Sequence, residues 1–179
     1  MKEDNSPSEV SRPQQFLEEV VQPNLVEFEA AVSNVRLAFN AVASVDALAA
    51  HIYVWCRENS ENSNDAKKEI ACVKTDDSYY RAKLASECPE FELLRDIAKA
   101  QKHVRRKWGN PQITGDDKVM SSQIGYGEGG YGCGRYGGPM QVVVLVGSKP
   151  EDFVFLEDVL KAATDFLKGK MKGLGALIL

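Results

Sequence analysis

The chain has 179 residues, of which 44% are apolar and 27% charged, and its formal net charge is −4. A chain of this length folds as one domain and buries a core without the help of disulfides. The negative balance argues against a general nucleic-acid coat or a membrane-surface protein.

The cysteines and the first residues indicate a cytoplasmic protein. Cys56, Cys72, Cys88 and Cys133 include no Cys-x-x-Cys pair, so they lack the usual redox or metal-binding spacing. Free thiols are typical of a reducing compartment. The polar N-terminal residues lack the apolar stretch of a signal peptide, and no run of about 18 apolar residues predicts a membrane span.

Two helices are predicted in the first third of the chain. A helical pattern starts at Pro13, and Pro23 is expected to kink or restart it because proline removes a backbone donor. Either Ser33 or Asn34 is suited to cap a longer helix that runs to Cys56. That helix is apolar around much of its girth, which predicts a place at the centre of a bundle.

The middle of the chain predicts a loop and two further helices. Asn59 to Asp65 has the polar composition of an exposed loop, and either Asp76 or Asp77 is suited to cap a short helix after it. The stretch from Pro89 to Trp108 has the clearest helical pattern of the chain. Its apolar residues recur every third or fourth position, acidic residues lie near its start and basic ones near its end.

The last third of the chain mixes strand and helix signals. Residues 118–124 are a weak strand candidate, whereas 141–146 carry five consecutive Val and Leu residues and predict a strand. Ser148 and Glu151 have capping-box spacing, which favours a helix that includes 153–155. A short strand at 153–155 is the alternative. The apolar residues 173–179 are expected to dock on the body or on a second copy.

These elements predict a mainly α fold. We expect an up-and-down bundle of about four helices with a small C-terminal β element and a final helix, an α+β arrangement. Residues 1–12 form a flexible tail, residues 13–108 the bundle, and residues 109–179 a Gly/Tyr-rich loop, the β element and the last helix.

The segment Gly125–Pro139 repeats one Gly/Tyr unit three times with a period of five. It contains the pattern G-x-G-x-x-G, but the dinucleotide motif needs a strand before it, and here the strand follows. Ordering so much glycine is entropically costly, and the tyrosines are the residues that can offset the cost by stacking. We therefore predict an interaction loop with Tyr126, Tyr131, Arg135 and Tyr136 as its contact residues.

A basic cluster ends the predicted 89–108 helix. Lys102, Arg105, Arg106 and Lys107 are able to bind phosphates, although cations at a helix C-terminus are also a common structural arrangement. The two histidines, His51 and His103, lie on unmatched helices and are too few for a metal site even with a nearby aspartate. We expect no metal and no other cofactor.

The segment Leu94–His103 resembles a motif of uncharacterised bacterial proteins in which a glycine–aromatic repeat and a valine-rich strand follow, as they do here over roughly residues 13–170. That resemblance implies no activity. The same segment is similar to the HEPN helical domains, whose members often act as dimeric RNases in toxin–antitoxin or phage-defence systems. Their motif is an Arg followed by a His, with four to six residues between the two. This resemblance implies a phosphate-binding role for Arg95 and an acid–base role for His103.

The match to the HEPN motif departs in its spacing. Seven residues separate Arg95 from His103, which puts the pair about 80° apart around a helix and about 12 Å apart along it. From the residues themselves we expect a non-catalytic interaction module that forms a homo-oligomer or binds a protein partner. The alternative is a HEPN-like RNA-binding protein or RNase that uses Arg95, His103 and the basic cluster.

Overall fold

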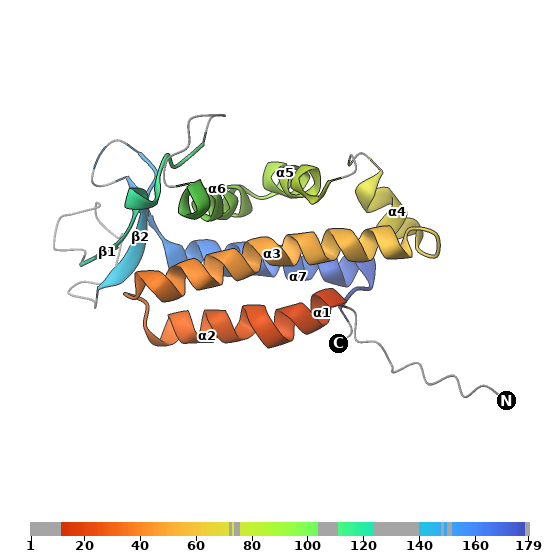
Figure 1. Cartoon of the computed structure of the whole chain (residues 1–179), viewed down its shortest axis with the longest axis horizontal. Coiled ribbons are helices and arrows are strands. Elements are labelled where there is room, and N and C mark those ends of the chain that lie inside the picture. Colours follow the sequence, from red (N-terminus) through yellow and green to blue (C-terminus); the bar gives the residue numbers. More distant parts are fainter. Residues whose placement is uncertain are drawn as a thin grey trace.

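The computed structural model describes residues 12–71, 73, 76–103, 111–123, 140–147, 149 and 152–177. The fold is mainly α, with a small antiparallel sheet at one end of a helical bundle (Figure 1). The predicted fold class is therefore confirmed.

The N-terminal helix is continuous but changes its winding before Pro23. It consists of α1 (Arg12–Phe16), a π-helical turn η1 (Leu17–Val21) and α2 (Gln22–Ala30). The backbone N–H of Gln22 donates to the carbonyl of Leu17, five residues earlier. A π turn adds one residue per turn, which accommodates the missing donor and the ring of the proline. The irregularity predicted at Pro23 is therefore this π-helical turn.

The central helix is α3 (Val35–Asn59), around which the others pack (Figure 1). The side chain of Asn34 accepts hydrogen bonds from the backbone N–H groups of Arg36 and Leu37, so Asn34 is the cap. By length and composition α3 could also cross a membrane, and most of its apolar stretch is buried inside the bundle. Its predicted central place is confirmed.

Three helices follow on one side of α3. They are α4 (Asn64–Ile70), α5 (Asp77–Glu87) and α6 (Pro89–His103). The side chains of Ser63 and Asp76 cap α4 and α5 by accepting backbone N–H groups. The predicted 59–65 loop is therefore shorter than expected, because α4 begins at its sixth residue. The last residues of the predicted 89–108 helix lie outside the described part of the chain.

The sheet has three strands in the order β1 (Val119–Ser122), β2 (Gln141–Leu145) and β3 (Phe153–Phe155). A short 3₁₀ turn, Asp116–Lys118, leads into β1. The preferred prediction of a helix over 153–155 is wrong, because these residues pair with β2 as an antiparallel strand. The last helix, α7 (Leu156–Leu174), begins directly after β3.

The inner face of the sheet closes one end of the core. Val119, Val142 and Val144 alternate toward the helices and belong to the buried cluster. Beyond the end of β3, the backbone N–H of Val142 donates to the carbonyl of Val32 at 2.8 Å. The connection between α2 and α3 thereby continues the hydrogen bonding of the central strand and fixes the sheet to the bundle.

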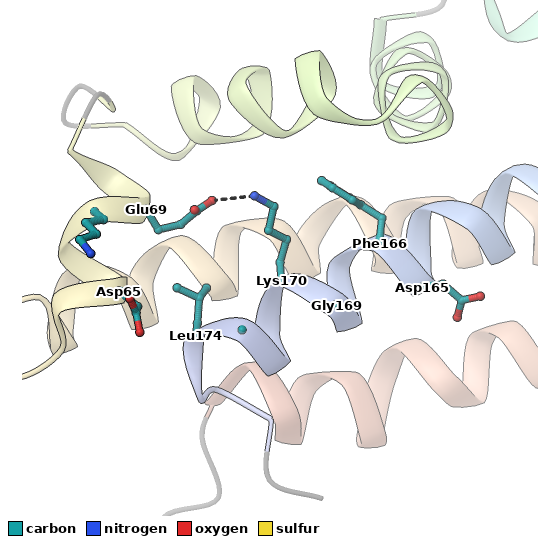
Figure 2. Close-up of a pocket in the computed structure, with 9 residues that line it drawn as sticks. Asp65, Glu69, Asp165, Phe166, Gly169, Lys170 and Leu174 are labelled. Carbon is teal, nitrogen blue, oxygen red and sulfur yellow. Dashed lines mark hydrogen bonds and ion pairs between the residues drawn. The ribbon is translucent and has the colours of Figure 1, made fainter.

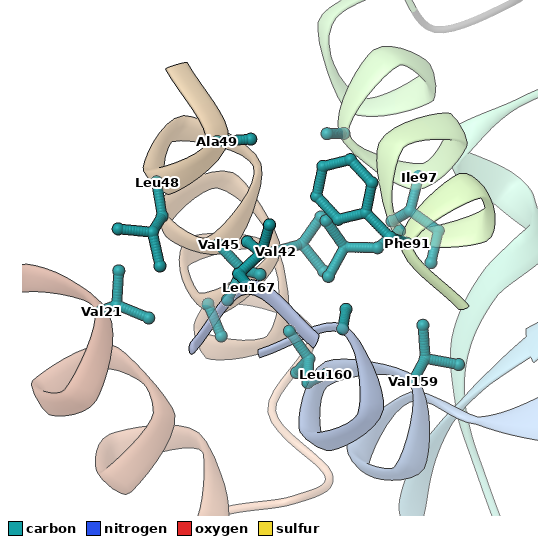
Figure 3. Close-up of a cluster of buried hydrophobic side chains, with 14 of the residues drawn as sticks. Val21, Val42, Val45, Leu48, Ala49, Phe91, Ile97, Val159, Leu160 and Leu167 are labelled. Carbon is teal, nitrogen blue, oxygen red and sulfur yellow. The ribbon is translucent and has the colours of Figure 1, made fainter. Parts of the chain in front are cut away.

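The core contains residues from every side of α3. Val45 and Leu48 of α3 meet Val21 of the N-terminal helix, Phe91 of α6 and Leu167 of α7 (Figure 3). All five side chains are fully buried. The N-terminal helix, α6 and α7 therefore pack on the same short stretch of α3.

The C-terminal tail docks on the body, as one of the two predicted alternatives. Gly175 adopts a left-handed conformation with φ 71°, and the backbone N–H of Ala176 donates to the carbonyl of Met171 at 2.9 Å. This is the hydrogen-bond pattern of a Schellman cap, in which glycine carries no steric penalty. Ala176 is fully buried as a result.

Replacing Leu48 by alanine tests the role of α3. Because Leu48 is completely buried, we expect L48A to lower the free energy of unfolding by about 2–5 kcal/mol. The measurement is urea unfolding followed by circular dichroism. The matched control is V54A, since Val54 lies on the same helix and is 42% exposed; we expect it to change stability by less than about 0.5 kcal/mol. Equal effects of the two variants would contradict the central role of α3.

Candidate functional site

Four charged side chains join α4, α5 and α7, and we call them the Glu69 network: Glu69, Lys83, Glu87 and Lys170. Glu69 Oε1 lies 2.8 Å from Lys83 Nζ and 3.4 Å from Lys170 Nζ. Lys170 Nζ also lies 2.5 Å from Glu87 Oε2. The network therefore binds the last helix of the fold to two helices that precede it by about eighty to one hundred residues.

Further polar contacts hold Glu69 in place. The hydroxyl of Tyr80 donates to Glu69 Oε1 at 3.3 Å, and Lys83 Nζ donates to the Glu69 carbonyl at 2.7 Å. Tyr80 is fully buried and its ring stacks on Tyr53 of α3. Glu69 thus sits at the boundary between the core and solvent, with partners from three sides.

The network keeps its members charged. Burial alone would raise the pKa of the Glu69 carboxyl, but the hydrogen bond from Lys83 and the charges of Lys170 and Lys83 outweigh it, so that pKa is lowered. Burial alone would lower the pKa of Lys170, but its contacts with Glu87 and Glu69 outweigh it, so that pKa is raised. Both groups are therefore ionised at neutral pH.

The thiol and the phenol beside the network stay protonated. Burial raises the pKa of Cys56 to about 12, and the Glu69 charge adds to the shift while Lys83 and Lys170 oppose it. Burial and the Glu69 charge also raise the pKa of Tyr80. A protonated, fully buried thiol is a poor nucleophile, so this arrangement supports packing rather than covalent chemistry at Cys56.

A groove lies beside the network between α4 and α7 (Figure 2). Its volume is about 570 Å³. Asp65 and Glu69 line it from α4, whereas Asp165, Gly169 and Lys170 line it from α7. Charged side chains line much of the groove, which opens on the outside of the bundle, away from the sheet.

A second ion pair lies between α3 and α5. Arg81 contacts Asp46 at 2.7 Å and Asp77 at 2.6 Å through its two terminal nitrogens. Asp46 is buried, and one of its carboxylate oxygens has no hydrogen-bond partner in the described part of the protein. A buried carboxylate requires a counter-charge, which Arg81 supplies here.

The structure places Arg95 and His103 in different surroundings. The Arg95 guanidinium is half-buried and donates to the carbonyl of Ser78 at 2.8 Å, so it holds the first turn of α5. His103 is exposed in the last turn of α6, next to exposed Lys102. The helix that carries both residues is regular, so the separation predicted from their spacing applies.

Several predicted contact residues lie outside the described part of the chain. They are Arg105, Arg106, Lys107, Tyr126, Tyr131, Arg135 and Tyr136. Their roles stay predictions.

His51, and the aspartate seven residues before His103, Asp96, have other partners in the fold. His51 stacks on Phe16 with ring centroids 3.9 Å apart, and burial lowers the pKa of His51. Asp96 is buried and accepts the backbone N–H of Gln112 at 2.9 Å. Among the residues that the structure describes, no group of three or more His, Cys, Asp or Glu is placed to hold a metal ion.

The outer face of the sheet is the second feature of interest, and we define the outer sheet face as Met120, Val143, Leu145, Phe153 and Phe155. Met120 and Phe155 both pair with Val143, and Leu145 pairs with Phe153, so the five share one side of the pleat. None of them belongs to the main buried cluster. The rings of Phe153 and Phe155 meet edge to face at 5.7 Å.

Sequence analysis did not find the Glu69 network. Lys83 and Glu87 are four residues apart on one helix, a spacing that signals a local pair. Glu69 and Lys170 are 101 residues apart, and no local pattern predicts their contact.

No family model, curated protein or solved structure matches this chain. The resemblances to bacterial proteins and to HEPN domains therefore stay predictions.

The pH dependence of stability tests the Glu69 network. Because the pKa of Glu69 is lower in the folded chain than in the unfolded one, its contribution is present above the unfolded value and is lost as pH falls through the lowered folded value. We expect E69Q to lose about 1–3 kcal/mol at pH 7 and to approach the wild type as the pH is lowered below about 4. Urea titrations from pH 7 to pH 3.5 measure this difference.

The matched control for that titration is E61Q, because Glu61 is exposed and precedes the same helix. We expect it to follow the wild-type stability at every pH. A difference between E69Q and wild type that stays constant with pH would show that Glu69 acts without its charge.

Proposed function

We propose that this protein is a non-catalytic interaction module that pairs with a second copy of itself. The contact consists of the outer sheet face together with the Gly/Tyr segment that connects β1 to β2. The helical bundle acts as the rigid support.

The single observation that carries this proposal is the apolar character of the outer sheet face. Its five residues are all apolar, whereas a sheet face turned to water usually carries polar side chains. Val143 at its centre is only 2% exposed, and Leu145, Phe153 and Phe155 are half-buried. Met120 is 39% exposed, and Met140 beside the start of β2 is 49% exposed. Apolar residues gathered in one place on a surface are typical of a protein interface.

The position of the Gly/Tyr segment supports the same surface. Ser122 at the end of β1 pairs with Gln141 at the start of the adjacent strand β2. The intervening chain, with Tyr126, Tyr131 and Tyr136, thus begins and ends at adjacent points of a fixed hairpin. Tyrosine supplies large contact area at low cost in conformational entropy, which suits a contact surface.

A second copy of the chain is the partner that requires the fewest complementary surfaces. In a two-fold dimer the same patch serves both subunits, so one self-complementary apolar face is sufficient. The ion pairs of the Glu69 network and of Asp46 with Arg81 support a structural role for the bundle, because their charges already have partners inside the fold.

Two serine substitutions on the outer sheet face test the dimer. We expect wild type to sediment at about twice the 19.8 kDa chain mass and F153S/F155S to sediment as a monomer, because the polar pair removes most of the aromatic contact area. Sedimentation equilibrium measures the mass, and circular dichroism checks that helical content is retained. The control is V26S, which changes an apolar residue of α2 that is 62% exposed. A monomeric wild type, or a dimeric F153S/F155S, would overturn the proposal.

RNA binding is a second candidate, favoured by the exposure of Lys102 and His103 at the cationic end of α6. In this candidate the basic cluster contacts phosphates, and cleavage, where it occurs, uses His103 as acid–base group. Arg95 would then have to release the Ser78 carbonyl that it holds in the structure.

A salt-dependent gel-shift assay tests this second candidate. If the basic cluster binds single-stranded RNA, we expect K102A/R105A/R106A to weaken binding and to reduce the slope of log K against log salt by about 0.7 for each phosphate that the variant no longer neutralises. The control K118A removes a cation from the turn before β1. Unchanged affinity in the triple variant would eliminate the candidate, and unchanged cleavage in H103A would eliminate the RNase form of it.

A further inference from the structure

The floor of the groove between α4 and α7 is formed by two glycines. Gly169 and Gly173 lie one turn apart on α7, both are exposed, and a Cβ added at either would meet nothing within 4 Å. Phe166 and Leu174 border the floor and pack partly against the core. The missing side chains leave a trough along the helix, with Phe166 and Leu174 as the apolar members of an otherwise charged lining.

An aspartate lies at each end of the groove. Glu69 and Lys170, which also line it, neutralise each other within the Glu69 network. Asp65 lies at the Leu174 end and Asp165 at the Phe166 end (Figure 2). Neither aspartate forms an ion pair within the residues that the structure describes.

Helix geometry sets the length of the groove along α7. Asp165 and Gly173 are eight residues apart on α7, which corresponds to about 12 Å along the helix axis. The C-terminal end of α7 lies at the Asp65 end, and the partial negative charge of a helix C-terminus also favours a cation there.

We propose that this groove binds a linear aliphatic diamine or polyamine. One ammonium group lies at Asp165 and the other at Asp65 and the end of α7, while the methylene chain lies over Gly169 and Gly173. The volume of about 570 Å³ lies within the range of about 300–1,000 Å³ that is usual for small-ligand sites.

The two aspartates favour a cationic ligand over an anion, and one lysine of the lining opposes it. An anion would meet both aspartates, and a short diamine would not reach both ends. Lys68 lines the groove from α4, is exposed and forms no ion pair in the described part of the chain. It opposes the cation at the Asp65 end, so its removal should tighten binding.

Titration calorimetry of the full chain at 150 mM salt with three probes tests the proposal. The probes are 1,8-diaminooctane, octylamine, which lacks the second ammonium, and 1,3-diaminopropane, which is too short. We expect the long diamine to bind at least about 3-fold tighter than either, since an exposed ion pair changes affinity by about 1.4- to 5-fold. Equal binding of octylamine would show that the second ammonium group contributes nothing. Equal binding of 1,3-diaminopropane would show that the length of the chain contributes nothing. Either result overturns the proposal.

Variants on the groove locate the site. We expect D65N and D165N each to weaken binding of 1,8-diaminooctane by about 1.4- to 5-fold and K68Q to tighten it by a similar factor. The control D158N removes an exposed carboxylate of α7 outside the groove and should leave the affinity unchanged.

Filling the floor gives an independent outcome. G169L should abolish binding, because the new side chain fills the floor of the groove. It should keep or raise the unfolding midpoint, because open space surrounds Gly169 and leucine has a higher helix propensity than glycine. Retained binding in G169L, or equal affinities in D165N and D158N, would show that the diamine binds elsewhere. F153S/F155S should bind as wild type does, so this test and the dimer test fail or succeed separately.

Discussion

The burial of α3 on nearly all sides is the constraint on which the rest of this structure depends. A helix that is apolar around most of its girth cannot lie on a surface, so neighbours must cover it from several directions. Val45 and Leu48 contribute to that contact, and Val21, Phe91 and Leu167 reach it from three different helices. The alanines of α3 allow these helices to approach closely. The order of the helices around α3 follows from the chain segments that connect them, most of which are short.

Polar groups at the edge of the core add specificity to this packing. Glu69 and Lys170 connect α4 to α7, and Arg81 connects α5 to the buried carboxylate of Asp46. Such pairs contribute little net stability relative to apolar residues, but leaving one member without its partner is costly. They therefore favour one relative placement of the helices. The groove beside Glu69 exists because α4 is short and α7 carries glycines at Gly169 and Gly173.

The sheet adds a surface that the bundle does not have. Its inner side completes the core. On its outer side Met120 and Phe155 flank Val143 from the two neighbouring strands, and Phe153 contacts Phe155 along β3. The hairpin that carries the Gly/Tyr segment is fixed to the bundle through Val142 and Val32. A sheet anchored to the bundle is a suitable support for a recognition surface, whereas the ionic groups of the Glu69 network and of Asp46 with Arg81 already have partners.

The sequence by itself determined the elements that depend on local patterns. The apolar girth of α3, the irregularity at Pro23, the valine-rich strand and, to within one residue, the caps of α3 and α5 are encoded close to where they act. Tertiary structure alone decided the rest. Phe153–Phe155 became a strand because β2 offered it hydrogen bonds, overriding a local capping signal. Arg95 donates a hydrogen bond to the Ser78 carbonyl, and Glu69 forms an ion pair with Lys170, 101 residues away in the sequence. The physical reason is range: capping and helical periodicity act over one turn, whereas pairing of strands and of distant charges exists only once the chain has folded.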